Sequence, residues 1–302
     1  MSATTTLPAA SGAARRTRPR TLSAFRGGPF TYGMLVILSA IFMVPLVFVV
    51  SIALASDFTV STGQLTILPR DWQFSNFVEI FRTSLPVGRF MINSVIIAVT
   101  SAIGQVLSSS LVGYAFARLR APGKKGLFLI VIATMMVPAQ ITMIPQFWIF
   151  SELGWVDTFL PLIVPQFFSN AFNIFLVRQF VTRIPYEMDE AASIDGLGFF
   201  GIYVRLILPM MSPILIAIAI FTLTAMWGDF MGPLIYINSE EKMPLALGVQ
   251  YLTSTSQELQ TPPWNLIMVG SIFLSLPMIV IYYFGQKYMY EMNLSAGSAG
   301  VK

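Results

Sequence analysis

The residues best suited to chemistry in this sequence lie close together, in a stretch of acidic and small side chains at residues 184–209. Pro185 fits the first turn of a helix, because its missing N–H would have no partner there. Glu187, Asp189 and Glu190 follow, and carboxylates are favourable at the positive end of the helix dipole. The pattern predicts a short helix whose acidic side chains can pair with basic groups on another molecule.

The same helix carries small residues and a defined end. Ala191 and Ala192 favour the helix and let another backbone approach closely. Asp195-Gly196 ends it, since glycine accepts the left-handed conformation without steric cost. A second segment, residues 197–205, leads to the next apolar stretch. This helix–turn–helix is either a docking element for a partner protein or an ordinary loop at a membrane surface, and the residues alone leave both open.

Composition excludes several kinds of site. The 302 residues include no Cys and no His, so disulfides, thiolate chemistry, imidazole acid–base catalysis and His-ligated metals are excluded. The chain is 55% hydrophobic and 11% charged, with a mean hydropathy of +0.73, whereas soluble domains carry about 25% charged residues. The net charge of +4 fits basic loops beside a membrane better than a nucleic-acid surface, so no nucleic-acid partner is expected.

Charged residues divide the chain into segments long enough to cross a bilayer. Six uncharged stretches reach 20 residues or more, and about 20 apolar residues span a hydrocarbon core of about 30 Å as a helix. Because backbone groups must be paired within lipid, each stretch should hold one helix. We therefore predict an all-α integral membrane protein with six transmembrane helices. The expected helices are 31–55, 90–115, 127–149, 158–177, 207–231 and 264–286, within a transmembrane domain of residues 30–287 that contains a loop at 178–206.

Lys and Arg predict the orientation. With the amino terminus inside, all but four of the 18 basic residues fall in cytoplasmic segments, and the exceptions are Arg70, Arg82, Arg89 and Lys242. Both termini then lie in the cytoplasm, residues 1–29 as a disordered basic tail beside membrane lipid and residues 288–302 as a polar tail. Ala53-Leu54-Ala55 resembles a signal-peptidase site, but the apolar stretch before it is longer than that of a signal peptide, which favours an uncleaved first helix.

Four residues in or beside the predicted helices are candidates for a translocation pathway: Gln140, Asn170, Trp227 and Asp229. Prolines near the first two can break helices, and broken helices at mid-membrane often line binding sites in transporters. Trp227 could stack on a ring of a bound ligand, and Asp229 is the one charged residue within the predicted helices. The alternative for the amides and Trp227 is packing between helices, and for Asp229 it is a capping or interface role near a helix end.

Several motifs together carry a resemblance to a known family. The loop reads Glu190-Ala191-Ala192, three residues, Gly196, nine residues, and then Leu206-Ile207-Leu208-Pro209. This is similar to the EAA signature of ABC-importer permeases, with Leu206 where the signature often has Ile. Gly113-Tyr114-Ala115-Phe116-Ala117-Arg118, Trp227-Gly228-Asp229-Phe230 and the end Ala299-Gly300-Val301-Lys302 also resemble MalG-type permease subunits of carbohydrate ABC importers. The likeness runs from about residue 30 to the end of the chain.

The resemblance implies a type I, MetI-like permease fold and a specific set of partners. It places Glu190, Ala191, Ala192, Asp195, Gly196, Leu208 and Pro209 in a loop that couples the permease to an ATPase. It implies a bacterial inner-membrane location, a second permease forming a heterodimer, a dimer of ATP-binding cassette ATPases, an extracytoplasmic sugar-binding protein and a carbohydrate substrate. No G-x-x-x-x-G-K-[ST] phosphate loop occurs in the sequence, so ATP and Mg²⁺ are expected on the partner ATPase and no catalytic residue or metal site on this chain.

Two other functions remain open to the sequence. An ion-coupled secondary carrier usually places ionisable groups mid-membrane, and this chain offers only Asp229. A membrane scaffold subunit without transport activity is the second alternative, against which broken helices and polar mid-membrane residues argue weakly. The sugar itself cannot be read from the residues.

Overall fold

The computed structural model describes residues 28–61, 71–255 and 262–297, and for residues 61, 254, 255 and 288–297 the backbone alone. All regular structure in these ranges is helical. Contacts divide the chain into two compact units, residues 1–46 and 47–302. The predicted tail 1–29 lies outside the described residues except for its last two. The last five residues of the predicted tail 288–302 also lie outside them, and the part before these continues a helix.

The first helix, α1 (Pro29–Ala53), begins in the first unit and ends in the second. It is apolar throughout, contains Pro45, and is long enough to cross a membrane. Most of its side chains up to Val50 are exposed, as expected of a helix whose neighbour is lipid.

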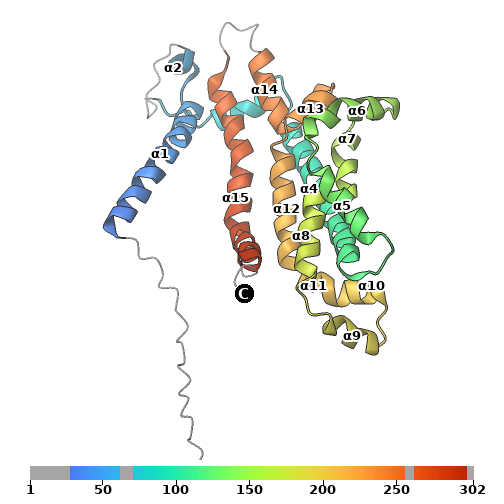
Figure 1. Cartoon of the computed structure of the whole chain (residues 1–302). Coiled ribbons are helices and arrows are strands. Elements are labelled where there is room, and N and C mark those ends of the chain that lie inside the picture. The colour runs from blue at the N-terminus through green and yellow to red at the C-terminus, as the bar shows by residue number, and fades with distance from the viewer. Residues whose placement is uncertain (1–27, 62–70, 256–261, 298–302) are drawn as a thin grey trace, which may run out of the picture. The chain divides into compact units, whose positions relative to one another are not determined.

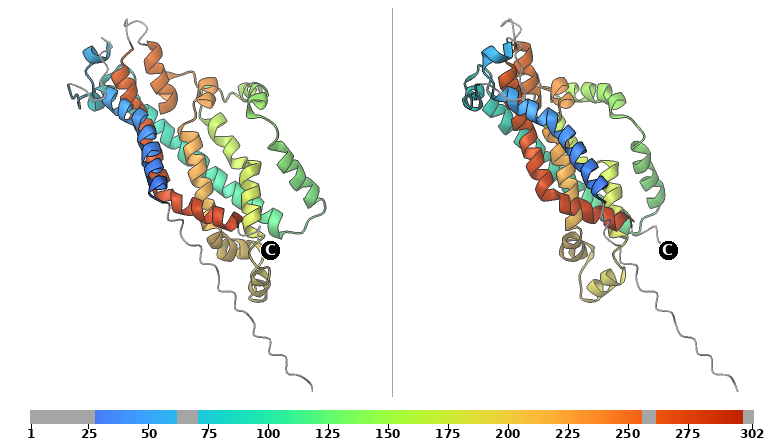
Figure 2. Two further views of the ribbon diagram at one scale, coloured as in Figure 1. Left: turned by 60° about the vertical axis from the view of Figure 1, so that its left-hand side comes forward. Right: turned by 90° about the vertical axis from the view of Figure 1, so that its left-hand side faces the viewer.

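The second unit is built around α4 (Val87–Arg118), which packs against α8 (Ala171–Val181) and α12 (Ser212–Trp227), while α12 packs against α15 (Trp264–Gly297). Figures 1 and 2 show α9 (Glu187–Ile194), α10 (Phe199–Ile202) and α11 (Leu208–Met210) at one end of these helices. At the opposite end lie α13 (Met231–Tyr236) and α14 (Leu245–Thr255). We call these the α9 end and the α13 end.

The helix predicted at 127–149 is not continuous. Two helices, α5 (Lys124–Thr134) and α6 (Ala139–Glu152), occupy this region and are bent by 98° relative to each other. Pro138 is extended and immediately precedes α6. A proline disfavours helical backbone in the residue before it, so the chain leaves the helix here even though its side chains stay apolar.

The regions predicted at 158–177 and 207–231 are also interrupted. The first contains α7 (Leu160–Ile163), the 3₁₀ helix η2 (Val164–Phe168) and α8, with a break at Ser169. The second is preceded by α10, the π-helical η3 (Tyr203–Ile207) and α11, and this run is bent by 73° where it meets α12. By length and hydropathy the described residues contain four candidate membrane spans, or up to six if each bent pair is one span.

The short elements at the α13 end are α2 (Asp57–Ser61), α3 (Asn76–Glu79), η1 (Ile80–Arg82) and η4 (Glu240–Lys242). Hydrogen bonds join α3 and η4 to long helices. Asn76 of α3 donates to the backbone oxygen of Ala53, the last residue of α1, at 2.9 Å. Asn93 of α4 donates to the backbone oxygens of Glu241 and Met243 at 2.9 and 3.0 Å. Asp157 accepts from the hydroxyl and backbone N–H of Ser239 and from Lys242, and these bonds hold the pKa of Asp157 well below its usual range.

Close approach at α4 depends on glycine. A Cβ on Gly113 would lie 2.5 Å from Cγ1 of Val177 on α8, and one on Gly104 would lie 2.5 Å from the ring of Phe167. Helix pairs in lipid are held by such close packing, since burial of apolar surface away from lipid adds little.

Gly113→Ala should therefore destabilise the chain by about 1–3 kcal/mol, the usual cost of forcing extra volume into a packed site. Gly126→Ala is the matched control, because Gly126 lies in α5 with no atom near its missing Cβ, and the change should be neutral or stabilising by up to about 1 kcal/mol. Thermal unfolding of both variants in detergent measures the difference. Equal unfolding temperatures for the two variants would show that the close contact between α4 and α8 does not determine the stability of the chain.

Candidate functional site

The stretch of acidic and small residues forms the helix that its sequence predicts. Helix α9 has Glu187, Asp189 and Glu190 in its first turn. After it, Gly196 takes a left-handed conformation with φ of +83°. The backbone N–H of Gly196 donates to the oxygen of Ser193, and that of Leu197 donates to the oxygen of Ala192, both at 3.0 Å. These two bonds form a Schellman motif, which turns the chain sharply into α10.

Large apolar side chains are exposed around this turn. Ile194 is 87% exposed, Phe199 74% and Phe200 73%. Glu190 and Ala191 of α9 are also exposed, whereas Asp189 is buried. Leu208 and Pro209, the other predicted residues of this element, begin α11. Contiguous apolar exposure beside acidic groups is typical of a protein-docking surface.

A groove of about 630 Å³ lies between α9 and the carboxyl end of α4. Its lining includes Tyr114, Arg118, Tyr186, Asp189 and Glu190. Nε of Arg118 lies 2.9 Å from Oδ2 of Asp189, and the two side chains are 8% and 9% exposed. Burial raises the pKa of Asp189, and the Arg118 guanidinium opposes this shift. The sequence indicated no role for Arg118 beyond a family motif, and the acidic residues of this helix, Asp189 among them, were expected to pair with basic groups on another molecule. For Asp189 this expectation is wrong, because its partner is Arg118 of the same chain. No signal in the sequence indicated the pair, because Arg118 belongs to a run of basic residues with Arg120, Lys124 and Lys125.

A buried group of amides supports the break before α8. Ser169 has φ of +58° and ψ of +150°, a region that a non-glycine residue rarely adopts. The side-chain amide of Gln105 on α4 is oriented so that its nitrogen faces an acceptor and its oxygen faces donors. Its nitrogen then donates to the backbone oxygen of Gln166 at 2.8 Å. Its own oxygen accepts from the N–H of Asn170 and the amide of Asn173, at 3.0 and 2.8 Å. Gln105 thus satisfies backbone groups on both sides of the break, which lipid could not do.

The four predicted pathway residues lie on or beside different helices. Asn170 lies at this break and Gln140 lies on α6, and both are exposed. Trp227 is buried at 6% exposure and donates from Nε1 to the oxygen of Leu274 at 2.8 Å, so it joins α12 to α15. Asp229 accepts from the N–H of Gly232 at 3.2 Å, as the capping interpretation expected.

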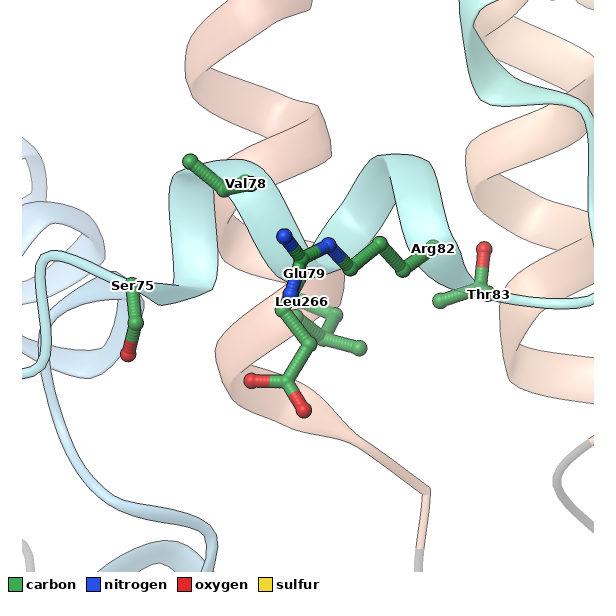
Figure 3. Close-up of a pocket in the computed structure, with 6 residues that line it drawn as sticks. All are labelled: Ser75, Val78, Glu79, Arg82, Thr83 and Leu266. Carbon is green, nitrogen blue, oxygen red and sulfur yellow. The ribbon is translucent and has the colours of Figure 1, made fainter.

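A second pocket, for which the sequence made no prediction, lies at the α13 end (Figure 3). It has a volume of about 560 Å³ and is lined by Ser75, Val78, Glu79, Arg82, Thr83 and Leu266. Figure 3 shows Arg82 extending from η1 over Glu79 and Leu266. Its charged side chains are exposed, so the pocket is an open surface rather than an enclosed site.

Comparison with known proteins gives consistent matches. Residues 109–290 match a family described as "Binding-protein-dependent transport system inner membrane component". The chain is 30% identical over 238 residues to the Arabinooligosaccharides transport system permease protein AraQ of Bacillus subtilis (strain 168), covering 79% of this chain and 82% of the relative. It is 26% identical over 267 residues to the Diacetylchitobiose uptake system permease protein NgcG of Streptomyces coelicolor, covering 87% and 86%.

A solved structure shares the fold. A chain of a bacterial ABC transporter involved in the import of the acidic polysaccharide alginate superposes with a TM-score of 0.74 and 24% sequence identity. The match covers 86% of this chain and 95% of that chain. The predicted all-α, MetI-like permease fold is therefore confirmed.

Gln105→Leu should lower the stability of the chain, because the N–H of Asn170 loses its partner and the backbone oxygen of Gln166 keeps only the longer bond from the hydroxyl of Ser108, at 3.4 Å. An unsatisfied buried group costs about 1–3 kcal/mol. Gln146→Leu, at an exposed position of α6, is the matched control and should change little. Thermal unfolding in detergent distinguishes the two, and a Gln105→Leu midpoint equal to that of the control would contradict the supporting role of Gln105.

Proposed function

Because the chain belongs to the family of binding-protein-dependent transport system inner membrane components, we propose that it is the permease subunit of an ATP-driven carbohydrate importer, coupled to a separate ATPase through α9. The observation that carries the proposal is the α9 turn itself. A Schellman motif at Gly196 holds a short helix with exposed Glu190 and Ala191 beside the exposed side chains of Ile194 and Phe199. That surface has the chemistry of a docking element, with an apolar centre and charge at its edge.

The α9 end is the cytoplasmic end in this proposal. Basic residues gather there, in keeping with the positive-inside rule. They are Arg118, Arg120, Lys124, Lys125, Arg178, Arg183 and Arg205, whereas the described basic residues toward the α13 end are Arg82, Arg89 and Lys242. Both termini then face the cytoplasm of a bacterium, and the pocket of Figure 3 faces outward.

The proposed partners follow from the transport mechanism. A second permease completes the pathway, a dimer of ATPases binds ATP and Mg²⁺, and an extracytoplasmic binding protein delivers the sugar. Carbohydrate is the proposed substrate because AraQ and NgcG are named for arabinooligosaccharides and diacetylchitobiose. Within this chain the pathway proposal rests on Gln140, whose side chain is exposed. Trp227 and Asp229 are engaged inside the chain, and so is Asn170, whose side-chain oxygen accepts from the N–H of Asn173 at 2.9 Å.

Gly196→Asp tests the coupling function. A non-glycine residue at φ of +83° costs roughly 1–2 kcal/mol, and the new charge changes the docking surface. In the full complex in proteoliposomes, we expect transport to be lost, with weaker copurification of the ATPase or ATP hydrolysis that no longer responds to sugar. Glu190→Ala should act in the same direction but less strongly, because it adds no bulk or strain.

The control for this test is Gly126→Asp, the same change at an open position outside the α9 turn, which should transport normally. If the Gly196→Asp complex transports at the wild-type rate with normal copurification, α9 is not the coupling element. Transport that needs an ion gradient instead of ATP would identify a secondary carrier.

Orientation can be tested directly, because the native chain contains no cysteine. A cysteine at exposed Ser193 should react with a membrane-impermeant maleimide only after the cytoplasmic side is opened. A cysteine at exposed Asn238 should react from outside in intact cells. The opposite pattern at either position would reverse the proposed orientation.

A further inference from the structure

Three side chains on one face of α4 contact the segment that contains α9 and α10. Ser110, Tyr114 and Arg118 are spaced four residues apart, so they lie in line along the last turns of the helix. The hydroxyls of Ser110 and Tyr203 lie 2.8 Å apart. The hydroxyl of Tyr114 donates to the backbone oxygen of Phe199 at 3.2 Å. Successive turns of α4 thus hold η3, α10 and, through Arg118, α9.

Arg118 makes the most extensive contact of the three. Its Nε lies 2.9 Å from Oδ2 of Asp189, and its Nη2 donates to the backbone oxygen of Ile184 at 2.8 Å. Its guanidinium carbon lies 5.6 Å from the ring centre of Tyr186. One side chain therefore contacts the residues that lead into α9 and the first turn of α9.

Asp189 depends on this arginine. The carboxylate is buried, and its Oδ1 has no hydrogen-bond partner among the described residues. Arg118 is the cation paired with Asp189 in the part of the chain that the structure describes. Without Arg118 the carboxylate would be a buried charge with no counter-charge, so α9 would have to shift to bring Asp189 into water.

The chain itself does not connect α9 to α4. Residues 182–186 join α9 to α8, and α10, η3 and α11 join it to α12. Movement of α9 can therefore reach α4 only through side-chain contacts, and α4 is the helix that packs against α8, α12, η2 and α14.

We infer that Arg118 is a positioning residue that locks α9 to α4 through its buried pair with Asp189, so that displacement of α9 is passed to α4 as one rigid body. The inference rests on the proposed coupling function and adds the route by which coupling enters the helix bundle. Arg118 does not touch the ATPase in this account and acts only through the placement of α9.

The test measures coupling separately from assembly. In the complete complex in proteoliposomes, Arg118→Gln and Asp189→Asn should lower the amount of sugar transported per ATP hydrolysed by about tenfold, within the usual range of coupling between sites. Copurification of the ATPase should stay near the wild-type level. Arg120→Gln, the same change at an exposed position two residues along, is the matched control and should keep the wild-type ratio.

A distance measurement gives a readout that does not depend on transport. Spin labels on cysteines placed at Ala121, just after α4, and at Ser193 of α9 should give one narrow distance distribution, the same with and without ATP. Arg118→Gln should broaden that distribution. If Arg118→Gln does not assemble, the transport ratio and the spin-label distance are both measured on Asp189→Asn, which keeps the shape of the side chain.

The outcomes separate this inference from the proposed function. An unchanged transport ratio together with an unchanged distance distribution in the variants would overturn the role of Arg118. If Gly196→Asp still uncouples transport in that case, only the route through α4 fails. If Gly196→Asp also has no effect, the coupling function of α9 itself is wrong.

Discussion

Helices in hydrocarbon gain little by burying apolar surface against one another, so close packing and hydrogen bonds between helices must hold them together. Helix α4 meets this constraint along its whole length. Gly104 and Gly113 remove the side chains that would collide with Phe167 and Val177. Buried polar groups between them, among them Gln105 and Ser110, then reach partners on neighbouring elements. The positions of α8, α12 and α9 all depend on this one helix.

The same constraint explains where the structure is irregular. Backbone groups freed by a helix break cannot be left unpaired in lipid, and the break at Ser169 is supported by Gln105 from a different helix. At the α13 end, Asn93 and Asp157 perform a similar task for the loop around η4. Polar side chains within or beside the bundle thus pair with backbone groups, and Asn170 is among them, because its side-chain oxygen accepts from the N–H of Asn173 at 2.9 Å.

A structural feature could be predicted from the sequence where the residues that cause it lie close together in the chain. Helix α9 and its end at Gly196 follow from residues within one turn of each other, and the structure has both. The uncharged stretches indicated the membrane-spanning regions, and the prolines near Gln140 indicated that a helix could break there, as it does between α5 and α6. The angle of 98° between these two helices was not predictable, because an apolar side chain suits lipid equally well on either side of a bend.

Long-range contacts could not be predicted from one sequence. Arg118 and Asp189 lie far apart in the chain, and the residues around each of them do not indicate that the two form an ion pair. The same limit applies to Trp227 and Asp229. Their residue types suggested that they line a translocation pathway, but their hydrogen bonds to Leu274 and Gly232 depend on how the chain packs. The family was nevertheless readable, because the motif that carries the resemblance is short and local.

The central claim is that the surface around α9 binds an ATPase, and site-specific photo-crosslinking tests it most directly. A photoreactive amino acid at Ile194, which is 87% exposed, would be compared with one at Asn238 at the opposite end of the bundle. The account predicts that the probe at Ile194 crosslinks to the ATPase in the assembled complex and that the probe at Asn238 does not. A crosslink to the ATPase from Asn238, or none from Ile194 in a complex that still transports, would contradict it.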